Sequence, residues 1–319
     1  MSTVAIVDHR FGELDVERGI LAAVGADVLD CAGMEPADAL AACADADAVI
    51  IGARLRLDAA SIATLTRCKV IVRYGIGFDN VDAEAAAAKG IWVAIVPDYC
   101  IAEVADHTIA SLLSLNRGLI TLDGLVRGGS WGIPPGFPTR RLSECVLGLI
   151  GFGRIGESVG RRAKGFGMRV LAHDPGRPEA EIRQAGAEPF AIDEMLPLVD
   201  YVSLHAPRVG DQPILDARRI GMLPTGAGVI NVARGGLIDE QALIKALEDG
   251  GVGAAALDVA NAEPVKADDP LLSAPNVIIT PHAAWYSREA IVELREKAAA
   301  EVARALDGTP PLHPVNQVR

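Results

Sequence analysis

The chain has 319 residues, more than the roughly 100–200 of one ordinary domain, so its length favours two domains. A formal net charge of -12 argues against nucleic acid as a partner, and an aromatic content of 4% provides little surface for stacking bases. The five cysteines are widely spaced and include no C-x-x-C pair, so they indicate neither a disulfide framework nor a metal site.

The first hundred residues alternate short apolar runs with alanine-rich amphipathic stretches. Buried strands are predicted at 4–7, 48–51, 70–72 and 91–96. The N-terminus lacks a basic region followed by a long apolar stretch, and no segment approaches 18 uninterrupted apolar residues. We therefore expect an α/β unit in a cytoplasmic protein without a membrane partner.

A helix is predicted next, because apolar residues recur at helical spacing over 100–117, and we interpret it as a connection between two domains. Residues 128–138 contain too many Pro and Gly for regular structure. A last helix is expected from about 287 to 306. Between them, a second series of strands is predicted at 146–151, 169–172, 201–205, 228–232, 254–259 and 277–280.

The second series begins with a glycine-rich turn, GFGRIG at 151–156, placed between a predicted strand and a predicted helix. Gly151 permits a tight turn, Gly153 lets the backbone approach a pyrophosphate, and Gly156 allows close packing of the helix. Asp174 ends the next apolar run, where a carboxylate can bind a ribose 2'-OH. The spacing predicts a dinucleotide site that favours NAD, although Arg177 lies near enough in sequence to approach the 2'-phosphate of NADP.

Three polar residues of the second series could carry chemistry. Arg234 directly follows a strand and precedes two glycines, where its guanidinium could hold a carboxylate, or could form a surface ion pair instead. His282 could donate and accept protons near neutrality, and Glu263 could orient it. Taken singly, Glu263 could equally be a loop acid before proline, and His282 a satisfied interior histidine.

Several motifs together make the chain resemble the D-isomer-specific 2-hydroxyacid dehydrogenases over nearly its whole length. They are RYGIGFDN at 73–80, the glycine-rich turn with Asp174, NVARGG at 231–236, LDV at 257–259, EP at 263–264 and TPH at 280–282. Two segments, HAAWYS at 282–287 and RYGIGFDN at 73–80, are most similar to the branch that contains the C-terminal-binding proteins.

The resemblance implies an α/β fold with two Rossmann-like doubly wound parallel-sheet domains. A flavodoxin-like substrate domain would comprise residues 1–100 and 286–319, and an NAD-binding Rossmann domain, residues 101–285, would be inserted into it. Relatives of this kind are usually homodimers through the cofactor domain.

The resemblance also implies the reaction: reduction of a small 2-oxo acid to the D-2-hydroxy acid by NADH, or the reverse. His282 would be the general acid/base, Glu263 its partner, and Arg234 the ligand of the substrate carboxylate; no metal is implied. Cofactor contacts are implied for Gly151, Gly153, Arg154, Ile155, Gly156, Asp174, His205, Ala206, Pro207, Val232, Ala233, Arg234, Asp258, His282 and Ala284. Substrate contacts are implied for Arg73, Tyr74, Gly75, Ile76, Arg234, His282 and Trp285.

Two departures from the family pattern bear on the substrate. Ala260 and Asn261 stand where many relatives carry a bulky residue, so the floor near Glu263 is expected to differ. Arg54 and Arg56 lie in a loop where many relatives carry apolar or neutral residues. Either they bind a second anionic group on the substrate, such as a carboxylate, phosphate or phosphonate, or they face solvent.

Two other functions compete with the reductase. The chain could be an NADH-responsive corepressor-like scaffold that binds peptide motifs, although it ends soon after its last predicted helix and lacks a long disordered extension. It could also oxidise another small anion such as phosphite, because those relatives keep a comparable Arg, Glu and His set. Glu263 argues against formate oxidation, whose enzymes resemble this chain but carry glutamine there.

Overall fold

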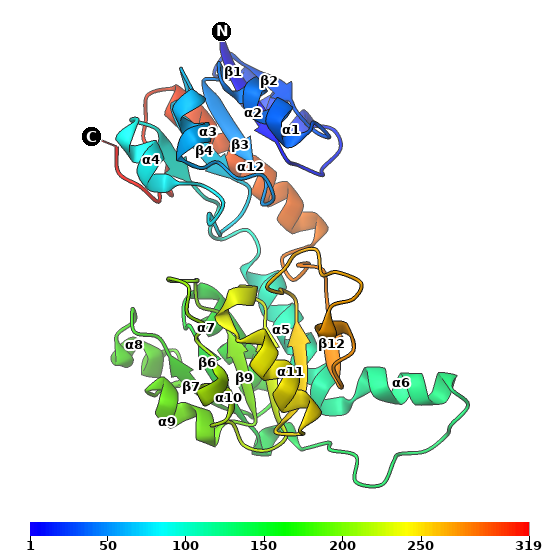
Figure 1. Ribbon diagram of the computed structural model, residues 1–319. Coiled ribbons are helices and arrows are strands. Elements are labelled where there is room, and N and C mark those ends of the chain that lie inside the picture. Colours follow the sequence, from blue (N-terminus) through cyan, green and yellow to red (C-terminus); the bar gives the residue numbers. More distant parts are fainter. Residues whose placement is uncertain (319) are drawn as a thin grey trace. The chain divides into compact units, whose positions relative to one another are not determined.

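The computed structural model describes residues 1–318, and the chain divides into two compact units. The first unit contains Met1–Tyr99 together with the segment that begins at Ser287, and the second contains Cys100–Tyr286. The second unit is therefore inserted into the sequence of the first (Figure 1).

The first unit is built on a five-stranded parallel sheet of order β2-β1-β3-β4-β5, the flavodoxin-like arrangement. Parallel sheets are covered on both faces, which explains why its inner strands are continuous apolar runs. Its strands are β1 (Ser2–Val7), β2 (Ala26–Asp30), β3 (Ala48–Ile51), β4 (Val70–Arg73) and β5 (Trp92–Ala94). Its helices are α1 (Asp15–Ala22), α2 (Pro36–Cys43), α3 (Ala59–Thr64), α4 (Ala83–Ala88) and α12 (Arg288–Leu306).

Strand β2 has no counterpart among the predicted strands. It lies at the sheet edge, and only Ala26 of its five residues is buried. An exposed edge strand needs no apolar run, so hydrophobic patterning gives no signal there. The C-terminal helix α12 packs against α1 and β4 within this unit.

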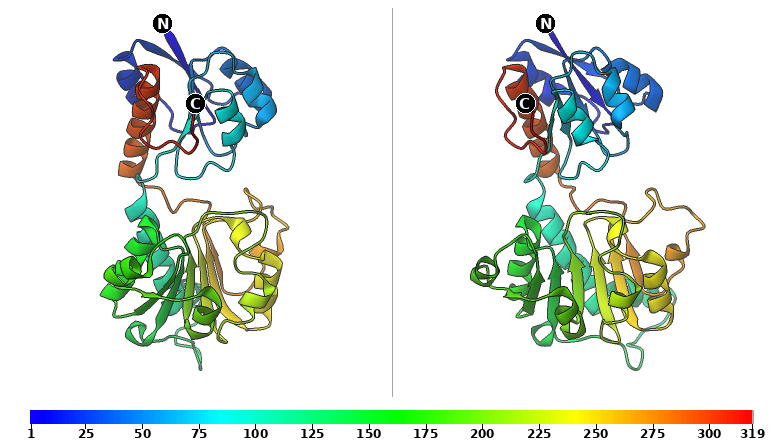
Figure 2. Two further views of the ribbon diagram at one scale, coloured as in Figure 1. Left: turned by 90° about the vertical axis from the view of Figure 1, so that its left-hand side faces the viewer. Right: turned by 60° about the vertical axis from the view of Figure 1, so that its left-hand side comes forward.

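The second unit has a seven-stranded parallel sheet of order β12-β11-β10-β9-β6-β7-β8, with helices on both faces (Figure 2). This is the Rossmann order extended by one strand, so the predicted fold class is confirmed. Its strands are β6 (Val146–Ile150), β7 (Arg169–His173), β8 (Glu188–Pro189), β9 (Tyr201–Leu204), β10 (Ala227–Asn231), β11 (Val252–Leu257) and β12 (Val277–Ile279). Its helices are α5 (Ile101–Arg117), α6 (Leu119–Arg127), α7 (Arg154–Gly165), α8 (Glu179–Gln184), α9 (Ile192–Met195), α10 (Ala217–Ile220) and α11 (Glu240–Glu248).

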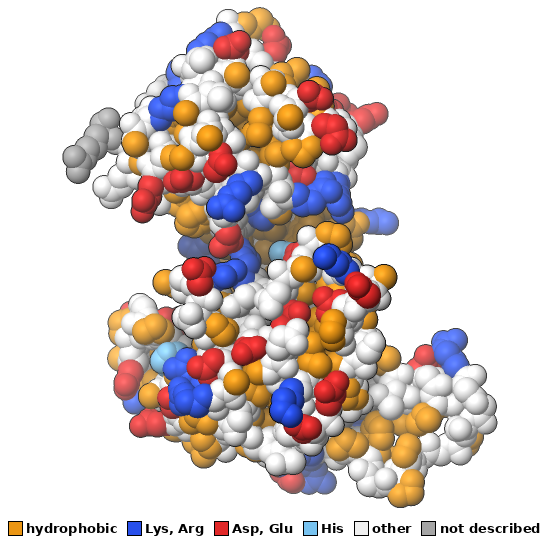
Figure 3. Space-filling view, in the orientation of Figure 1, with side chains coloured by type: hydrophobic (Ala, Val, Ile, Leu, Met, Phe, Trp, Pro, Cys, Tyr) orange, Lys and Arg blue, Asp and Glu red, His pale blue; other side chains and the backbone are white. Residues whose placement is uncertain are grey.

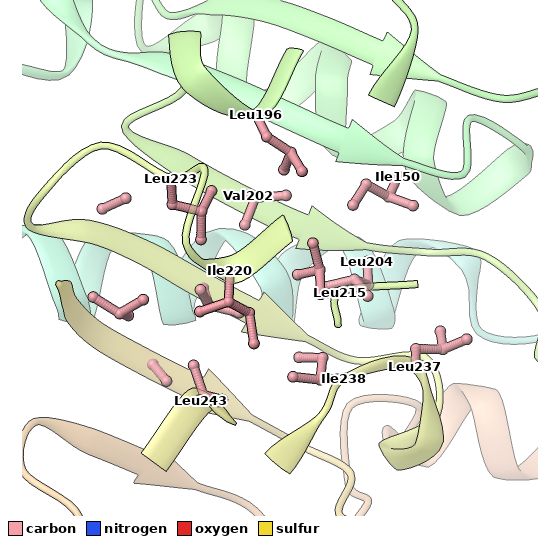
Figure 4. Close-up of a cluster of buried hydrophobic side chains, with 14 of the residues drawn as sticks. Ile150, Leu196, Val202, Leu204, Leu215, Ile220, Leu223, Leu237, Ile238 and Leu243 are labelled. Carbon is pink, nitrogen blue, oxygen red and sulfur yellow. The ribbon is translucent and has the colours of Figure 1, made fainter. Parts of the chain in front are cut away.

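One face of this sheet is covered by a large apolar cluster (Figure 4). Ile150, Val202 and Leu204 from the central strands meet Leu237 and Leu243 from the segments that cover them. The packing stiffens the carboxyl ends of β6 and β9, between which the strand order reverses. Open α/β sheets bind ligands at this point.

The helix predicted over 100–117 forms as α5, but it lies wholly within the second unit, where it packs against α7, β10 and β11. A further helix, α6, follows Gly118, which adopts left-handed backbone and ends α5. Residues 128–138 contain no helix or strand, as predicted. Among the described residues no single helix is long and apolar enough to cross a membrane, and only α5 with α6, bent by 56°, meets the length and composition criteria as a pair.

Candidate active site

The glycine-rich turn leaves β6 and leads into α7 at the reversal of strand order. Gly151 has φ of 90°, and a Cβ there would lie 2.6 Å from the backbone nitrogen of Ala206. A Cβ at Gly156 would overlap the carbonyl oxygen of Gly151. By contrast, a Cβ at Gly153 would meet nothing within 4 Å, so the space before the helix N-terminus is open. The turn thus fits a pyrophosphate, which the amides and dipole of α7 would stabilise; Arg154 and Ile155 begin that helix.

Asp174 lies beside this turn. Its Oδ2 accepts a hydrogen bond from the Phe152 amide at 2.7 Å, and its Oδ1 accepts one from the Gly176 amide at 2.9 Å. These bonds hold the carboxylate at the carboxyl end of β7, where a ribose hydroxyl would be received in this fold.

The segment after β9 lies on the other side of the reversal. His205, Ala206 and Pro207 follow Leu204 directly, and the His205 Nε2 lies 2.9 Å from the Ser203 hydroxyl. Burial lowers the pKa of His205 to about 3, so its ring is neutral. The ring would therefore add no charge beside the pyrophosphate of a bound cofactor.

His282 and Glu263 form a direct pair, with 2.8 Å between Nδ1 and Oε2. Burial alone would raise the pKa of the Glu263 carboxyl, but the hydrogen bond and charge of His282 outweigh it and lower that pKa below its ordinary value. Glu263 is thus a carboxylate at neutral pH, and it orients the imidazole. The other oxygen, Oε1, accepts from the Ala260 amide at 3.3 Å.

The backbone of His282 adopts a left-handed conformation with φ of 54°, which is uncommon for a residue other than glycine. Asp258 holds it there: its carbonyl accepts the His282 amide at 2.8 Å, and its buried carboxylate accepts the amides of Ala283 and Ala284, both at 2.8 Å. The Thr280 hydroxyl also donates to this carboxylate, at 2.6 Å. The segment that carries the imidazole is thus fixed at both ends.

Arg234 follows β10 in extended backbone, and its Nη1 donates to the Ala233 carbonyl at 2.7 Å. Asn231 accepts the Ala233 amide and donates to the Arg234 carbonyl, which fixes the turn. Gly235 is required because a Cβ there would overlap the Ala260 backbone. The positive charge of Arg234 contributes to lowering the pKa of Glu263, so the two groups interact; Val232 precedes this turn, half-buried.

In the first unit, the loop after β4 is tied down at its start. Arg73 donates from Nη1 to the Tyr74 carbonyl at 2.7 Å, and a Cβ at Gly75, whose φ is 137°, would overlap that guanidinium. The buried Tyr74 hydroxyl donates to Glu17 at 2.7 Å, and Glu17 accepts from Arg295 at 2.8 and 2.7 Å. This network leaves Ile76 and Gly77 half-buried beyond it.

Arg54 is paired within its own unit. Its guanidinium lies 2.9 Å from Asp8 Oδ1, and the Asp8 Oδ2 accepts the amides of Arg54 and Leu55. The Arg54 side chain is 61% exposed, and Arg56 is exposed as well. One of the two charges is therefore already balanced by a carboxylate.

Some contributors to this site gave no signal in the sequence. His107 of α5 lies 3.1 Å from the Thr280 hydroxyl. In the first unit, Glu17 bonds Tyr74, 57 positions along the chain, and Arg295, 278 positions along, and only folding creates these pairings. The Trp285 indole donates to the His282 carbonyl at 2.9 Å, which supports the imidazole segment in addition to any contact with substrate. Within residues 1–318, no group of three or more His, Cys, Asp or Glu side chains is arranged to hold a metal ion.

This site has the features of a dinucleotide-dependent oxidoreductase. They are an open parallel sheet with a glycine-rich turn, an acid after the second strand of that sheet and a histidine paired with a carboxylate. The family model of the "D-isomer specific 2-hydroxyacid dehydrogenase, NAD binding domain" matches residues 109–284. The chain belongs to this family and is an NAD-dependent 2-hydroxyacid dehydrogenase.

Individual relatives agree with this membership. The chain is 34% identical to a glyoxylate reductase of Korarchaeum cryptofilum over 284 residues, which covers 86% of this chain and 83% of the relative. It is 36% identical to a glyoxylate reductase of Pyrococcus furiosus over 260 residues, which covers 78% and 77%. The D-lactate dehydrogenase of Aquifex aeolicus, solved with NAD and lactic acid, has a TM-score of 0.85 at 26% identity and covers 96% of each chain. The narrower assignment to the branch of the C-terminal-binding proteins stays a prediction.

Proposed function

We propose that the enzyme reduces a small 2-oxo acid to the D-2-hydroxy acid, with His282 as general acid, Glu263 as its partner and Arg234 as the carboxylate ligand. The pairing of His282 with Glu263 at 2.8 Å, in the unit that carries the glycine-rich turn, is the observation that supports this most directly. The glyoxylate reductases among the relatives indicate a short oxo acid.

Each residue has a defined task in this proposal. Bound NADH supplies the hydride that reaches the 2-oxo carbon. His282, held through Nδ1 by Glu263, donates the proton on its other ring nitrogen to the carbonyl oxygen. Arg234 binds the carboxylate and, with the imidazolium, stabilises the negative charge that develops on the oxygen. Oxidation of the hydroxy acid is the reverse, with neutral His282 as base.

The proposal also assigns substrate contacts to the first unit. The amides of residues 74–77 would bind the carboxylate, since Arg73 and the Glu17 network hold the start of that loop. A second anionic group would be bound by Arg56, and by Arg54 if it exchanges its bond to Asp8 for one to the substrate. Trp285 would form a wall of the substrate pocket.

The test is NADH consumption across glyoxylate, pyruvate, hydroxypyruvate, branched and aromatic 2-oxo acids, oxaloacetate and phosphonopyruvate. We expect turnover with short acids and its loss in His282→Ala, while NADH binding is retained. NADH binding without turnover on any acid would contradict the proposal; capture of peptide motifs would then indicate the scaffold, and phosphite-dependent NAD reduction the alternative oxidation.

The second-anion part has its own test. Arg54→Ala and Arg56→Ala should raise KM for oxaloacetate and phosphonopyruvate and leave KM for glyoxylate unchanged. Unchanged KM values for every dianionic acid would contradict the proposed second-anion site but not the proposed reductase activity. Arg67→Ala is a matched control, since Arg67 pairs with Asp47 elsewhere in the same unit.

A homodimer through the second unit is also proposed. Helix α6 has no buried residue, and it extends from the sheet with the loop after it as an arm that bears apolar side chains (Figures 1 and 3). Trp131 is 91% exposed, Ile133 78% and Ile120 59%, and exposed apolar side chains gathered on one segment are typical of an interface with a second copy. Light scattering should give twice the chain mass, and Ile120→Glu with Trp131→Glu should give the monomer. A wild-type monomer would contradict it.

A further inference from the structure

Arg177 lies three residues beyond Asp174, where an arginine in this fold could serve a 2'-phosphate, but its guanidinium is bonded elsewhere. Its Nη1 lies 2.8 Å from Glu157 Oε2 and donates to the Phe152 carbonyl at 2.8 Å. Its Nε lies 3.4 Å from Glu181 Oε2. The side chain is only 22% exposed.

The elements around it fix this position. Phe152 is fully buried within the glycine-rich turn, and the guanidinium lies 5.2 Å from the centre of its ring. Glu157 belongs to the first turn of α7, whose positive N-terminal end favours a carboxylate. Arg177 is therefore held by a charge pair, a carbonyl and an aromatic ring at once.

The charges beside the ribose position do not suit a phosphate. Asp174, Glu157 and Glu181 are three carboxylates, and Arg177 is one cation paired with two of them. A 2'-phosphate adds about two negative charges at neutral pH, by analogy with other phosphate monoesters. It would meet a carboxylate where it needs a donor, whereas the neutral 2'-OH of NADH can donate to Asp174.

We propose that Glu157 is a cofactor-specificity residue: it bonds the Arg177 guanidinium and so keeps that cation from binding the 2'-phosphate of NADP. Selection of NADH then rests on two groups. Asp174 accepts a hydrogen bond from the free 2'-OH of NADH. Glu157 binds the Arg177 guanidinium, so that this cation is not available to a 2'-phosphate. The inference concerns the adenosine end of the cofactor and does not depend on which oxo acid is reduced.

The experiment compares 2',5'-ADP with 5'-AMP, and NADPH with NADH, by calorimetric titration of Asp174→Ser, Glu157→Gln and the double variant. Asp174→Ser alone should lower the affinity for NADH and should raise the affinity for 2',5'-ADP only slightly. The double variant should bind 2',5'-ADP about 10- to 100-fold more tightly than Asp174→Ser does, the gain expected of one charge-assisted hydrogen bond. Arg177→Ala in the double variant should abolish that gain, and 5'-AMP affinity should differ little between the single and double variants.

A matched control is Glu179→Gln, because Glu179 forms an exposed pair with Arg183 on the same helix as Glu181. Combined with Asp174→Ser, it should leave 2',5'-ADP affinity unchanged. If Asp174→Ser does not fold, Asp174→Asn can replace it, because asparagine keeps an acceptor for the Phe152 amide. The affinity for 2',5'-ADP is then compared with and without Glu157→Gln in that background. Equal 2',5'-ADP affinity with and without Glu157→Gln, or a gain that survives Arg177→Ala, would overturn the proposal.

Discussion

The Nδ1 of His282 lies 2.8 Å from Oε2 of Glu263, although 19 residues separate them in the chain. The carboxylate therefore meets the ring nitrogen that the proposed proton transfer to substrate does not use. An imidazole bound in this way has a defined tautomer and orientation before substrate arrives.

Glu263→Gln keeps the size of the side chain and removes its charge. Because the carboxylate orients the imidazole, we expect kcat for reduction to fall by about 10²-fold or more. Steady-state rates of NADH oxidation measure this effect. Glu240→Gln is the control, since Glu240 bonds the nearby Asn261 amide instead. An unchanged kcat in Glu263→Gln would count against the assigned role.

Thr280→Val removes a hydroxyl donor from the buried Asp258 carboxylate. We expect a loss of about 1–3 kcal/mol in the free energy of unfolding of the second unit, because the buried carboxylate loses one of its three hydrogen-bond donors. The left-handed segment at His282 should also loosen and lower kcat. Thr66→Val removes an exposed hydroxyl from the Ala44 carbonyl and should cost much less. Equal losses in thermal unfolding for the two variants would be inconsistent with this explanation.

Gly156→Ala and Gly165→Ala place the same methyl group on the same helix. The first would overlap the Gly151 carbonyl, and the second meets nothing within 4 Å. We expect Gly156→Ala to lower the free energy of unfolding by about 1–3 kcal/mol and to reduce the affinity for NADH strongly, because the glycine-rich turn must move. Gly165→Ala should bind NADH as the wild type does. Calorimetric Kd values and melting temperatures separate the two cases, and tight NADH binding by Gly156→Ala would refute the packing argument.

The buried pair of Glu17 and Arg295 should make the first unit sensitive to acid. Burial raises the pKa of Glu17, but the hydrogen bonds from Arg295 and Tyr74 outweigh it, so its folded pKa lies below the ordinary 4.5. Because the folded pKa is depressed, its contribution to stability is complete above about pH 4.5 and is lost as pH falls through the folded pKa.

Glu17→Gln should cost roughly 3–5 kcal/mol at pH 7, since it leaves a buried guanidinium without its counter-charge. Denaturant unfolding of the first unit at pH 7 and pH 3 tests this, and the difference between variant and wild type should shrink at pH 3. Glu17→Met with Arg295→Met should recover most of the loss. A loss of equal size at both pH values would mean that the charge is not the cause.

The inner strands of both sheets were predictable from single apolar runs, because a parallel strand that is buried on both faces consists almost entirely of apolar residues. The edge strand β2 and helix α6 were not, since β2 is largely exposed and α6 buries no residue. The residue range of helix α5 was predicted correctly, but its role as a connection between two domains was not. Apolar periodicity shows that a helix has a buried face, but it does not show which unit that face packs against.

Features of this protein that depend on local backbone geometry could be recognised in the amino-acid pattern. The spacing of Gly151, Gly153 and Gly156 and the position of Asp174 suffice for a nucleotide turn, because each acts within its own loop. Which charged side chains form pairs depends instead on the fold. It pairs Arg54 with Asp8, Arg177 with Glu157 and Glu17 with Arg295, and these pairings depend on through-space distances that a linear pattern does not contain.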